Sequence, residues 1–395
     1  MQQPNKMPEV ATQELPPEAY TSEEWLAQEN KNLFSRSWVF AGTESKVANA
    51  GDYMTAKAGH FTLVVIRGND GELRAFHNIC RHRGTELLDR GCGNTGKTIV
   101  CPYHSWTFGL DGALRGIPEQ RACFPDIDKK ENGLHKASVA VFKGFVFVNP
   151  EPDQDLSDWL SGLEDVVWPH DITSPELISY GDAVTYEMQC NWKVFFENAI
   201  DGYHLAYLHK NTLGGPTQDK NIWDPYGDNQ VWYSTENETV RSRVPNFVSN
   251  RMDKWNAKKI PHAEKEGYGG VYMLFPTTLI VASPWSFSVS VMEPVSAGVT
   301  RLNVYVWAAK SWMSNRGSVK DIPGYDKATG LIKSSHWKVH PLETQDFQTE
   351  DVYVVEKMQR ALMSPKYSVG KMAAGPGAES PLTYFQRSVL RHMEA

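Results

Sequence analysis

Two short stretches that each pair a cysteine with a histidine are the clearest candidates for chemistry in this 395-residue chain. A Cys-x-His stretch at residues 80–82 is followed by eighteen residues and then by Cys-x-x-His at 101–104. Thiolates suit the ferric irons of an iron–sulfur cluster, and imidazoles that replace two thiolates raise its reduction potential. We therefore expect Cys80, His82, Cys101 and His104 to bind a [2Fe-2S] cluster.

A structural zinc ion is the alternative occupant of these four side chains, because two cysteines and two histidines also satisfy tetrahedral zinc. Zinc fingers usually pair Cys with Cys and His with His, whereas here each stretch carries one of each, which favours the cluster. The chain holds only five cysteines. This odd, small number argues against a disulfide framework and favours a reducing, cytoplasmic location.

A second group of metal-binding residue types lies in NWKVFFENAIDGYHLAYLH, residues 191–209. Asp201 and His204 are three apart and would share one face of a helix. His204 and His209 are five apart, a rotation of about 140° on a regular helix. Both can reach one metal only if the helix bulges or ends between them. Two histidines and one carboxylate would leave open positions for dioxygen and substrate on non-haem iron, Fe(II); packing or hydrogen bonding is the alternative role.

These motifs resemble those of Rieske-type non-haem iron oxygenases, over a span from about Trp38 to the C-terminal helix. CRHRG and CPYHSW resemble the cluster loops of that family, and residues 191–209 resemble its iron motif. Respiratory Rieske proteins carry an extra cysteine in each loop, where this chain has Thr85 and Tyr103. The loops therefore resemble those of the oxygenases and not those of the respiratory proteins.

The resemblance implies a third iron ligand from a later helix that carries Glu-Asp and then Glu and Gln. Glu350-Asp351, Glu356 and Gln359 fit this pattern, and Asp351 is the expected ligand. Glu350 and Asp346 stay open as alternatives. Asp351 could also be a solvated acid at a helix start, where the helix dipole favours negative charge.

In the family, a carboxylate links a cluster histidine of one subunit to an iron histidine of its neighbour. The resemblance assigns this catalytic role to Asp201, between His104 and His204. A carboxylate that accepts an imidazole N–H fixes the orientation of the ring, so the alternative is that Asp201 orients His204 alone. The family also implies a homotrimer, with or without a small second subunit.

The pattern of helices and strands expected around these residues predicts an α+β chain in three parts. Residues 1–38 would be an N-terminal tail and helix packed on the catalytic domain, with the helix over 21–38. Residues 39–150 show short alternating strands and predict a small all-β Rieske domain. Residues 151–395 predict a helix-grip catalytic domain, in which an antiparallel sheet is covered by helices that include 191–210, a segment from Glu350 and a last helix over 384–393.

Composition excludes several classes of protein. A net charge of −7 gives no electrostatic case for nucleic acid, and no apolar run is long enough for a membrane span. The N-terminal residues lack the pattern of a signal peptide. The glycine-rich residues 371–379 lack the context of a dinucleotide site, so a separate reductase, with or without a ferredoxin, is expected to supply electrons.

The substrate is expected to be a small organic molecule. Aromatic residues of the catalytic part favour an aromatic compound and mono- or cis-dihydroxylation; they include Phe195, Phe196, Tyr207, Phe275, Trp285 and Phe287. A quaternary amine is the alternative, because aromatic rings also attract ammonium groups and EDVYVVEKMQRALMSPKY resembles the choline and betaine monooxygenase branch. A ligand-binding protein without iron and an electron carrier with two irons are the non-enzyme alternatives.

Overall fold

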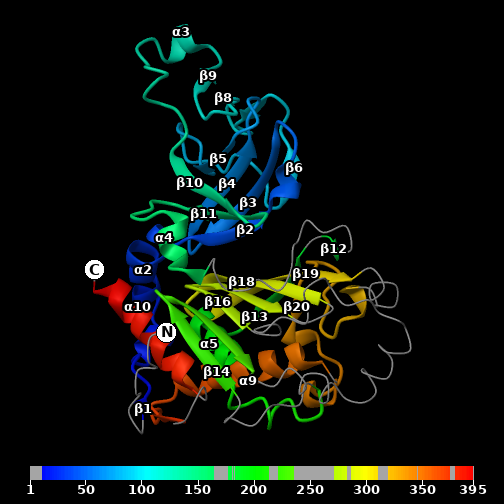
Figure 1. Cartoon of the computed structure of the whole chain (residues 1–395). Helices are drawn as coiled ribbons and strands as arrows, with labels where there is room; N and C mark the ends of the chain where they lie inside the picture. The colour runs from blue at the N-terminus through cyan, green and yellow to red at the C-terminus, as the bar shows by residue number, and fades with distance from the viewer. Residues whose placement is uncertain are drawn as a thin grey trace. The chain divides into compact units, whose positions relative to one another are not determined.

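The computed structural model forms two compact units, one of residues 1–29 with 160–395 and the other of residues 30–159. Described residues are 11–163, 177–179, 181, 183–212, 221–234, 271–282, 286–309, 319–344, 346–373 and 379–394. Figure 1 labels many of their elements. None of the helices in these ranges is long and apolar enough to cross a membrane.

The smaller unit is a β-structure whose main sheet has seven strands in the order β2-β11-β10-β5-β4-β3-β6. These are β2 (Val39–Thr43), β3 (Asp52–Ala58), β4 (Phe61–Arg67), β5 (Leu73–His77), β6 (Cys92–Asn94), β10 (Lys136–Phe142) and β11 (Phe145–Asn149). A second sheet consists of β7 (Thr98–Val100), β8 (Thr107–Gly109) and β9 (Leu114–Gly116). Short helices are η1 (Phe34–Arg36), η2 (Glu44–Val47), α3 (Gln120–Cys123) and, at the end of the unit, α4 (Leu156–Leu160).

The sequence FTLVVIRGNDGELRAFHN predicts two alternating runs joined by an Asn-Asp-Gly turn, and β4 and β5 form this hairpin. Strand β10 pairs with β11 in register Ser138–Asn149 to Phe142–Phe145. Cys80, Cys101 and Trp106 belong to one buried cluster with residues of β4, β5, β7 and β8. The candidate cluster cysteines are therefore part of a packed core.

The larger unit contains a nine-stranded sheet in the order β14-β15-β16-β17-β18-β19-β13-β20, with β12 also paired to β19. All these pairs are antiparallel except β13–β20. Strand bounds are β12 (Leu177–Ser179), β13 (Val184–Met188), β14 (Asn221–Tyr226), β15 (Asn229–Ser234), β16 (Val271–Leu274), β17 (Thr278–Ala282), β18 (Ser286–Ser296), β19 (Val299–Ala309) and β20 (Ile332–Lys333). A separate pair joins β1 (Ala11–Thr12) to β21 (Lys371–Met372).

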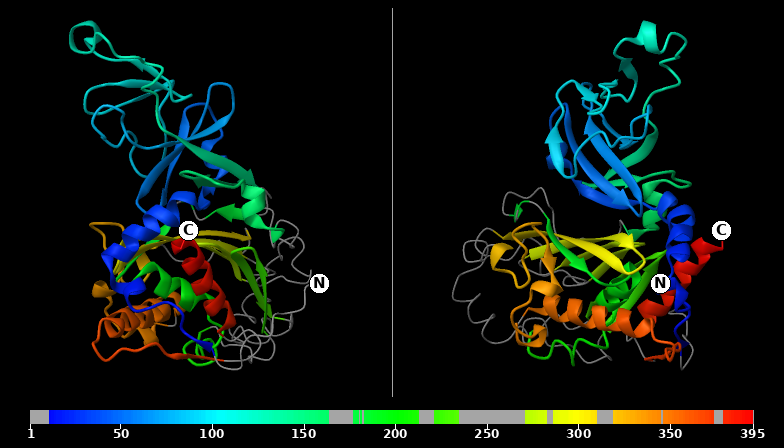
Figure 2. Two further views of the ribbon diagram at one scale, coloured as in Figure 1. Left: turned by 90° about the vertical axis from the view of Figure 1, so that its left-hand side faces the viewer. Right: turned by 180° about the vertical axis from the view of Figure 1, so that it is seen from behind.

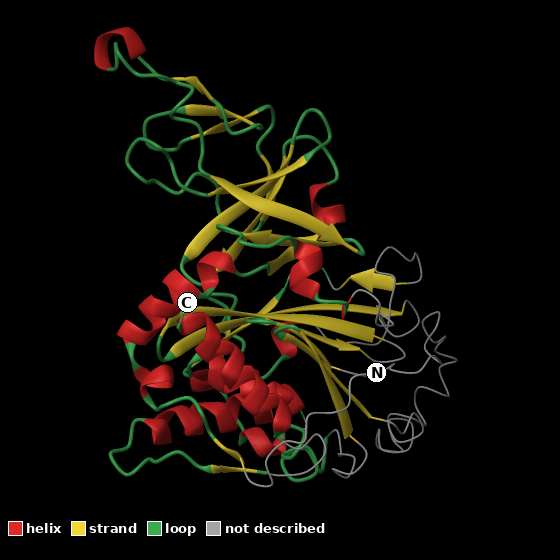
Figure 3. Ribbon diagram, turned by 60° about the vertical axis from the view of Figure 1, so that its left-hand side comes forward, coloured by secondary structure: helices red, strands yellow, loops and turns green. Residues whose placement is uncertain are grey.

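Helices cover one face of this sheet, as Figure 3 shows. They are α5 (Trp192–Ile200), α9 (Phe347–Leu362) and α10 (Ser380–Met393), with α1 (Glu18–Thr21) and α2 (Glu23–Asn32) from the N-terminus. Short 3₁₀ turns are η5 (Val319–Asp321), η6 (Ser334–His336) and η7 (Pro341–Glu343). In the views of Figure 2, α10 lies beside the N-terminal segment, to which Gln386 is hydrogen bonded. This confirms the predicted α+β fold of an antiparallel sheet covered by helices.

The N-terminal helix differs from the prediction of one helix over 21–38. Ser22 does cap α2, since its Oγ accepts from Trp25 N at 3.2 Å, but α2 ends at Asn32. Beyond it, the hydroxyls of Ser35 and Ser37 donate to backbone carbonyls four residues earlier, at 2.6 and 2.7 Å. Such bonds compete with the regular helical pattern and here accompany a 3₁₀ turn.

Two further helical predictions need correction. The helix expected over 191–210 ends at Ile200, and residues 201–212 form turns. The spacing of Val352, Val355, Met358 and Gln359 predicts one shared side of α9, but Met358 is 43% exposed, because the other three residues define a narrower buried stripe. Of the predicted aromatic residues, Phe195, Phe196 and Phe275 are buried and Tyr207 is 67% exposed. Trp285 and residues 374–378 lie outside the described residues, as does the side chain of Phe287.

Candidate metal centres

The two cysteine–histidine loops share one backbone conformation. The first loop follows the end of β5 and the second follows the end of β7. In each, the cysteine N–H donates to the carbonyl five residues on, and the cysteine carbonyl accepts from the N–H four residues on, at 2.8–3.0 Å. The fourth residue is left-handed in both, Gly84 with φ 74° and Ser105 with φ 56°. The sequence therefore builds the same tight turn twice, each presenting one Cys and one His.

The ligand atoms of these loops meet in like pairs. The sulfurs of Cys80 and Cys101 are within hydrogen-bonding reach, and His82 Nδ1 lies 3.1 Å from His104 Nδ1. Two imidazole nitrogens bound to one tetrahedral metal at about 2.1 Å would be roughly 3.4 Å apart. The spacing of the two imidazoles therefore fits two histidines on one metal, and the two sulfurs form a second pair.

The cysteine and histidine ligands differ in burial. Both cysteines are buried, whereas both histidines are half-buried. Burial raises the pKa of the Cys80 thiol, and a hydrogen bond from the His82 backbone N–H opposes this by favouring the thiolate. Burial and the charge of His104 lower the pKa of His82, which favours the neutral imidazole that metals bind. Trp106 stacks on His82 with ring centroids 5.0 Å apart and limits its rotation.

The second centre begins where α5 ends. Asp201 is the residue after the helix, and its N–H donates to Asn198 O at 3.2 Å. His204 then starts a separate turn, in which its carbonyl accepts from Leu208 N at 2.8 Å. The chain thus leaves the helix before the first histidine, which removes the 140° mismatch of a regular helix.

His204, His209 and Asp351 lie close enough to share one metal ion, with one ligand atom from each within 4.8 Å of the others. Asp351 Oδ1 lies 2.9 Å from His209 Nε2 and 3.6 Å from His204 Nε2. Both imidazoles therefore turn the same nitrogen towards one carboxylate from α9. Two nitrogens and one carboxylate on one side leave open positions of the kind that non-haem iron uses.

The other nitrogen of each imidazole faces a different carboxylate. His204 Nδ1 lies 3.0 Å from Asp201 Oδ2, and His209 Nδ1 lies 2.7 Å from Glu350 Oε2. Glu350, an open alternative for the third ligand, thus lies behind His209 and away from the shared volume. The other alternative, Asp346, caps α9 by accepting from Gln348 N at 3.0 Å. The geometry favours Asp351.

Charge also suits a cation at this site. Burial alone would lower the pKa of His209, but Asp351 and Glu350 outweigh it and raise that pKa. With Asp201, three carboxylates surround two imidazoles. Metal-bound histidines commonly pass their second N–H to a carboxylate in this way, so the donor set fits Fe(II).

Sequence reasoning missed one polar residue of this site. Thr212 Oγ1 donates to Glu350 Oε2 at 2.8 Å and so fixes the carboxylate that faces His209. A threonine three residues after a histidine gives no recognisable signal, because its partner is 138 positions away.

Comparisons with known proteins cover both units. Residues 37–141 match the Rieske [2Fe-2S] domain, and residues 176–395 match the catalytic domain of the ring-hydroxylating alpha subunit. The carnitine monooxygenase oxygenase subunit of Acinetobacter pittii is 28% identical over 94% of this chain and 93% of its own. The naphthalene 1,2-dioxygenase large component of Pseudomonas aeruginosa is 36% identical over 48% of this chain and 43% of its own.

A solved quaternary ammonium Rieske monooxygenase with its substrate L-carnitine shares the fold, with a TM-score of 0.73 and 24% identity over 97% of this chain and 96% of the other. The chain spans about half the length of the glycine betaine monooxygenase oxygenase subunits it matches, 52% for that of Chromohalobacter salexigens. The matched domains indicate a [2Fe-2S] cluster and Fe(II) as cofactors. On the match to 220 of its 395 residues, 176–395, the chain belongs to the family of ring-hydroxylating alpha subunits, with a Rieske domain preceding the catalytic one.

Proposed function

We propose that this protein is a terminal oxygenase that uses dioxygen and two electrons from a separate reductase to hydroxylate a small organic substrate. The observation that carries the proposal is the occurrence in one chain of two converging donor sets. One set consists of paired Cys and His loops, and the other of two histidines and a carboxylate. An electron carrier would need only the first set, and a binding protein neither.

In this proposal, Cys80, His82, Cys101 and His104 hold the cluster, and His204, His209 and Asp351 hold Fe(II). A cluster held by the first set would supply electrons, and Fe(II) held by the second would supply the activation of dioxygen. The half-buried edges of His82 and His104 provide the route for electrons, since both cysteines are buried. Asp201 has a side chain that is 14% exposed and faces His204, so a cluster histidine of a second copy could reach it.

The boundaries 39–150 and 151–395 are proposed for the two domains, with residues 1–38 packed on the second. A homotrimer, with or without a small second subunit, is the proposed assembly. It would bring each cluster beside the iron of a neighbour through a repeated head-to-tail interface. Inter-subunit electron transfer is named for the solved quaternary ammonium monooxygenase.

A quaternary amine is the proposed substrate class. The carnitine relative matches 94% of this chain, so the similarity extends through the catalytic unit. The charge of the site agrees, because Asp201, Glu350 and Asp351 would exceed the two positive charges of Fe(II) and leave a net attraction for a cation. Phe347, 44% exposed and with its ring 6.3 Å from that of His209, could contribute a cation–π contact.

The test is coupled oxygen uptake by the full-length protein with a reductase and NADH. Carnitine, glycine betaine and choline are compared with naphthalene and indole, and products are analysed by mass spectrometry with ¹⁸O₂. Hydroxylation of a carbon next to nitrogen gives an unstable product that splits into an amine and an aldehyde, which are the expected products. A protein that holds fewer than about three irons per chain, or takes up no oxygen with any substrate, would contradict the proposal.

An aromatic substrate is the second candidate, favoured by the 36% identity to the naphthalene dioxygenase component. That identity is higher than with the carnitine relative but extends over only half of the chain. A cis-diol from naphthalene, with both oxygen atoms from ¹⁸O₂, would decide for this candidate.

A further inference from the structure

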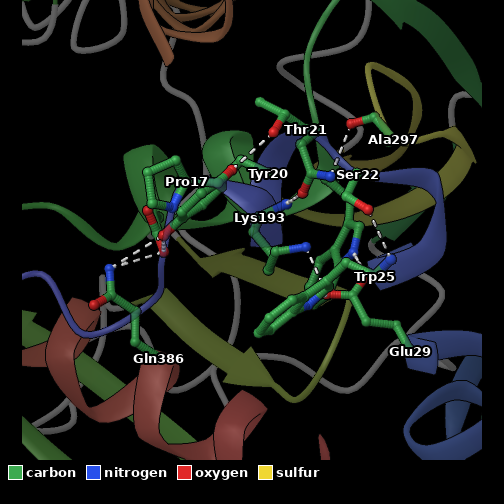
Figure 4. Close-up of polar contacts among 12 residues, drawn as sticks. Pro17, Tyr20, Thr21, Ser22, Trp25, Glu29, Lys193, Ala297 and Gln386 are labelled. Atoms are coloured by element: carbon green, nitrogen blue, oxygen red, sulfur yellow. Dashed lines mark hydrogen bonds and ion pairs between the residues drawn. The ribbon is translucent and has the colours of Figure 1, made fainter. Parts of the chain in front are cut away.

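The N-terminal helices α1 and α2 lie outside both matched domains, which begin at residues 37 and 176. Up to Glu29, they nevertheless belong to the compact unit that holds the candidate iron site. Their side chains contribute polar groups to a fully buried region, part of which Figure 4 shows.

A buried ion pair fixes α2 against α5. Lys193 Nζ lies 2.6 Å from Glu29 Oε1, and neither side chain is exposed. The indole N–H groups of Trp25 and Trp192 donate to the two oxygens of Glu29 at 3.1 and 2.9 Å. Because removal of one partner from such a pair leaves an uncompensated buried charge, α5 strongly requires α2 at this position.

Tyr20 makes a second connection, and it joins two helices at once. Its hydroxyl donates to Glu197 Oε1 of α5 at 2.7 Å, and its backbone carbonyl accepts from Gln359 Nε2 of α9 at 2.9 Å. Gln359 Oε1 in turn accepts from the N–H of Asn191, the residue that caps α5, at 2.9 Å. Tyr20 is 1% exposed, so this cross-link is shielded from water.

The two helices joined by Tyr20 carry the candidate iron residues. Asp201 follows Glu197 by four residues, one turn of α5 further on. Asp351 precedes Gln359 by eight residues, about 12 Å along α9 at a rise of 1.5 Å per residue. A change in the spacing of α5 and α9 at Tyr20 would therefore alter the separation of Asp201 and His204 from Asp351.

We propose that Tyr20 is a positioning residue for the mononuclear iron: by cross-linking α5 and α9 through Glu197 and Gln359, it sets the spacing of the histidines and Asp351. The inference rests on the proposed function, since it takes these residues as the iron site. It gives the N-terminal segment a role in oxygenase chemistry, and it explains why Glu197 and Gln359, which hold no metal, accompany the metal motifs.

The test is Tyr20→Phe in the full-length, iron-loaded protein, which removes one hydroxyl and keeps the ring and the carbonyl. We expect the electron paramagnetic resonance signal of the nitric oxide complex of Fe(II), which reports ligand geometry, to broaden. Release of the mononuclear iron to a chelator should become roughly tenfold faster, as for other residues that orient metal ligands. Cluster absorption should stay unchanged.

Tyr367→Phe is the matched control. The Tyr367 hydroxyl donates to Gln13 Oε1 at 2.7 Å, so this variant also loses one hydrogen bond between the N-terminal segment and the rest of its unit. It should keep the parental signal and iron release. If Tyr20→Phe lowers the melting temperature but keeps both iron properties, or if the control changes them equally, the positioning role is wrong. Iron content and oxygen uptake of the parent test the proposed function separately.

Discussion

The two histidines of the candidate iron site have partners of the same chemical type but differ in their exposure to solvent. Each turns Nε2 towards Asp351 and Nδ1 towards a second carboxylate. For His204, 17% exposed, that carboxylate is Asp201, which is 14% exposed. For His209, 1% exposed, it is Glu350, 2% exposed, which Thr212 also holds.

This difference in exposure separates two roles of a carboxylate behind a metal ligand. A buried carboxylate whose oxygen already accepts two hydrogen bonds can only orient its histidine. A carboxylate at the surface can orient its histidine and also accept a donor from outside. We therefore propose that Glu350 serves metal retention and Asp201 serves electron delivery.

The largest expected effect comes from removing a shared ligand. His204→Ala should lose the mononuclear iron and all turnover, because only His209 and Asp351 would remain. The iron content should fall from about three to about two per chain, and the visible absorption of the cluster should persist. His60→Ala, at an exposed histidine outside both sites, serves as the control. Simultaneous loss of iron and cluster would show that the ligands are divided wrongly between the two centres.

Asp201→Asn should show the next largest effect. The amide still occupies the space beside His204, so both metals should remain bound, while coupled turnover should fall about 100-fold. Asp346→Asn is the matched control, since asparagine caps a helix as well as aspartate does. Metal analysis and product formed per electron consumed measure the two properties. If Asp201→Asn lost iron but transferred electrons normally to what remained, the proposed roles of Asp201 and Glu350 would have to be exchanged.

Glu350→Gln should have a smaller effect, and on iron affinity instead of turnover. The neutral side chain no longer stabilises the imidazole of His209 by charge, so the affinity for Fe(II) should fall about tenfold. Turnover per bound iron should be retained. Thr212→Val should reproduce this effect more weakly, and Thr212→Ser should not. Iron titration with a competing chelator measures the affinity, and an unchanged affinity in Glu350→Gln would remove the distinction between the two carboxylates.

How much of this site the sequence predicts depends on the separation of the partners along the chain. The cluster loops are local motifs, and both adopt the same turn, with His82 Nδ1 and His104 Nδ1 3.1 Å apart; their binding of a cluster stays a prediction. Asp351 was chosen over Glu350 on the family resemblance, because neighbours on a helix point about 100° apart and only the packing of α9 decides which faces the histidines. The spacing of His204 and His209 left open a bulge or a helix end between them, whereas α5 ends at Ile200, before both histidines.

Long-range partners were out of reach of sequence reasoning. Lys193 and Glu197 lie in a recognised motif, but their partners Glu29 and Tyr20 are 164 and 177 residues away. A lysine in an apolar helix indicates a buried carboxylate somewhere without identifying it. The fold class, in contrast, follows from strand alternation and helical spacing, which are local.

The smallest effect is expected for Glu197, a carboxylate as buried as Glu350 but without a histidine. Burial raises the pKa of Glu197 to about 7, although hydrogen bonds from Tyr20 and Gln386 oppose the shift. The unfolded chain has a pKa of about 4.3 at this residue. Because the folded state binds the proton more tightly, this stabilisation is complete below about pH 4.3 and is lost as the pH rises through about 7.

Glu197→Gln keeps a hydrogen-bond acceptor for Tyr20 and removes the titration. Relative to this variant, the parent should therefore lose melting temperature as the pH rises from about 5 to about 8. Thermal unfolding of both proteins across that range measures the difference, and a constant difference would show that Glu197 does not titrate there. Iron affinity should be equal in the two proteins. If Glu197→Gln lost affinity for iron as Glu350→Gln is expected to do, any buried carboxylate near the site would support iron binding. The contact of Glu350 with His209 would then not explain its role.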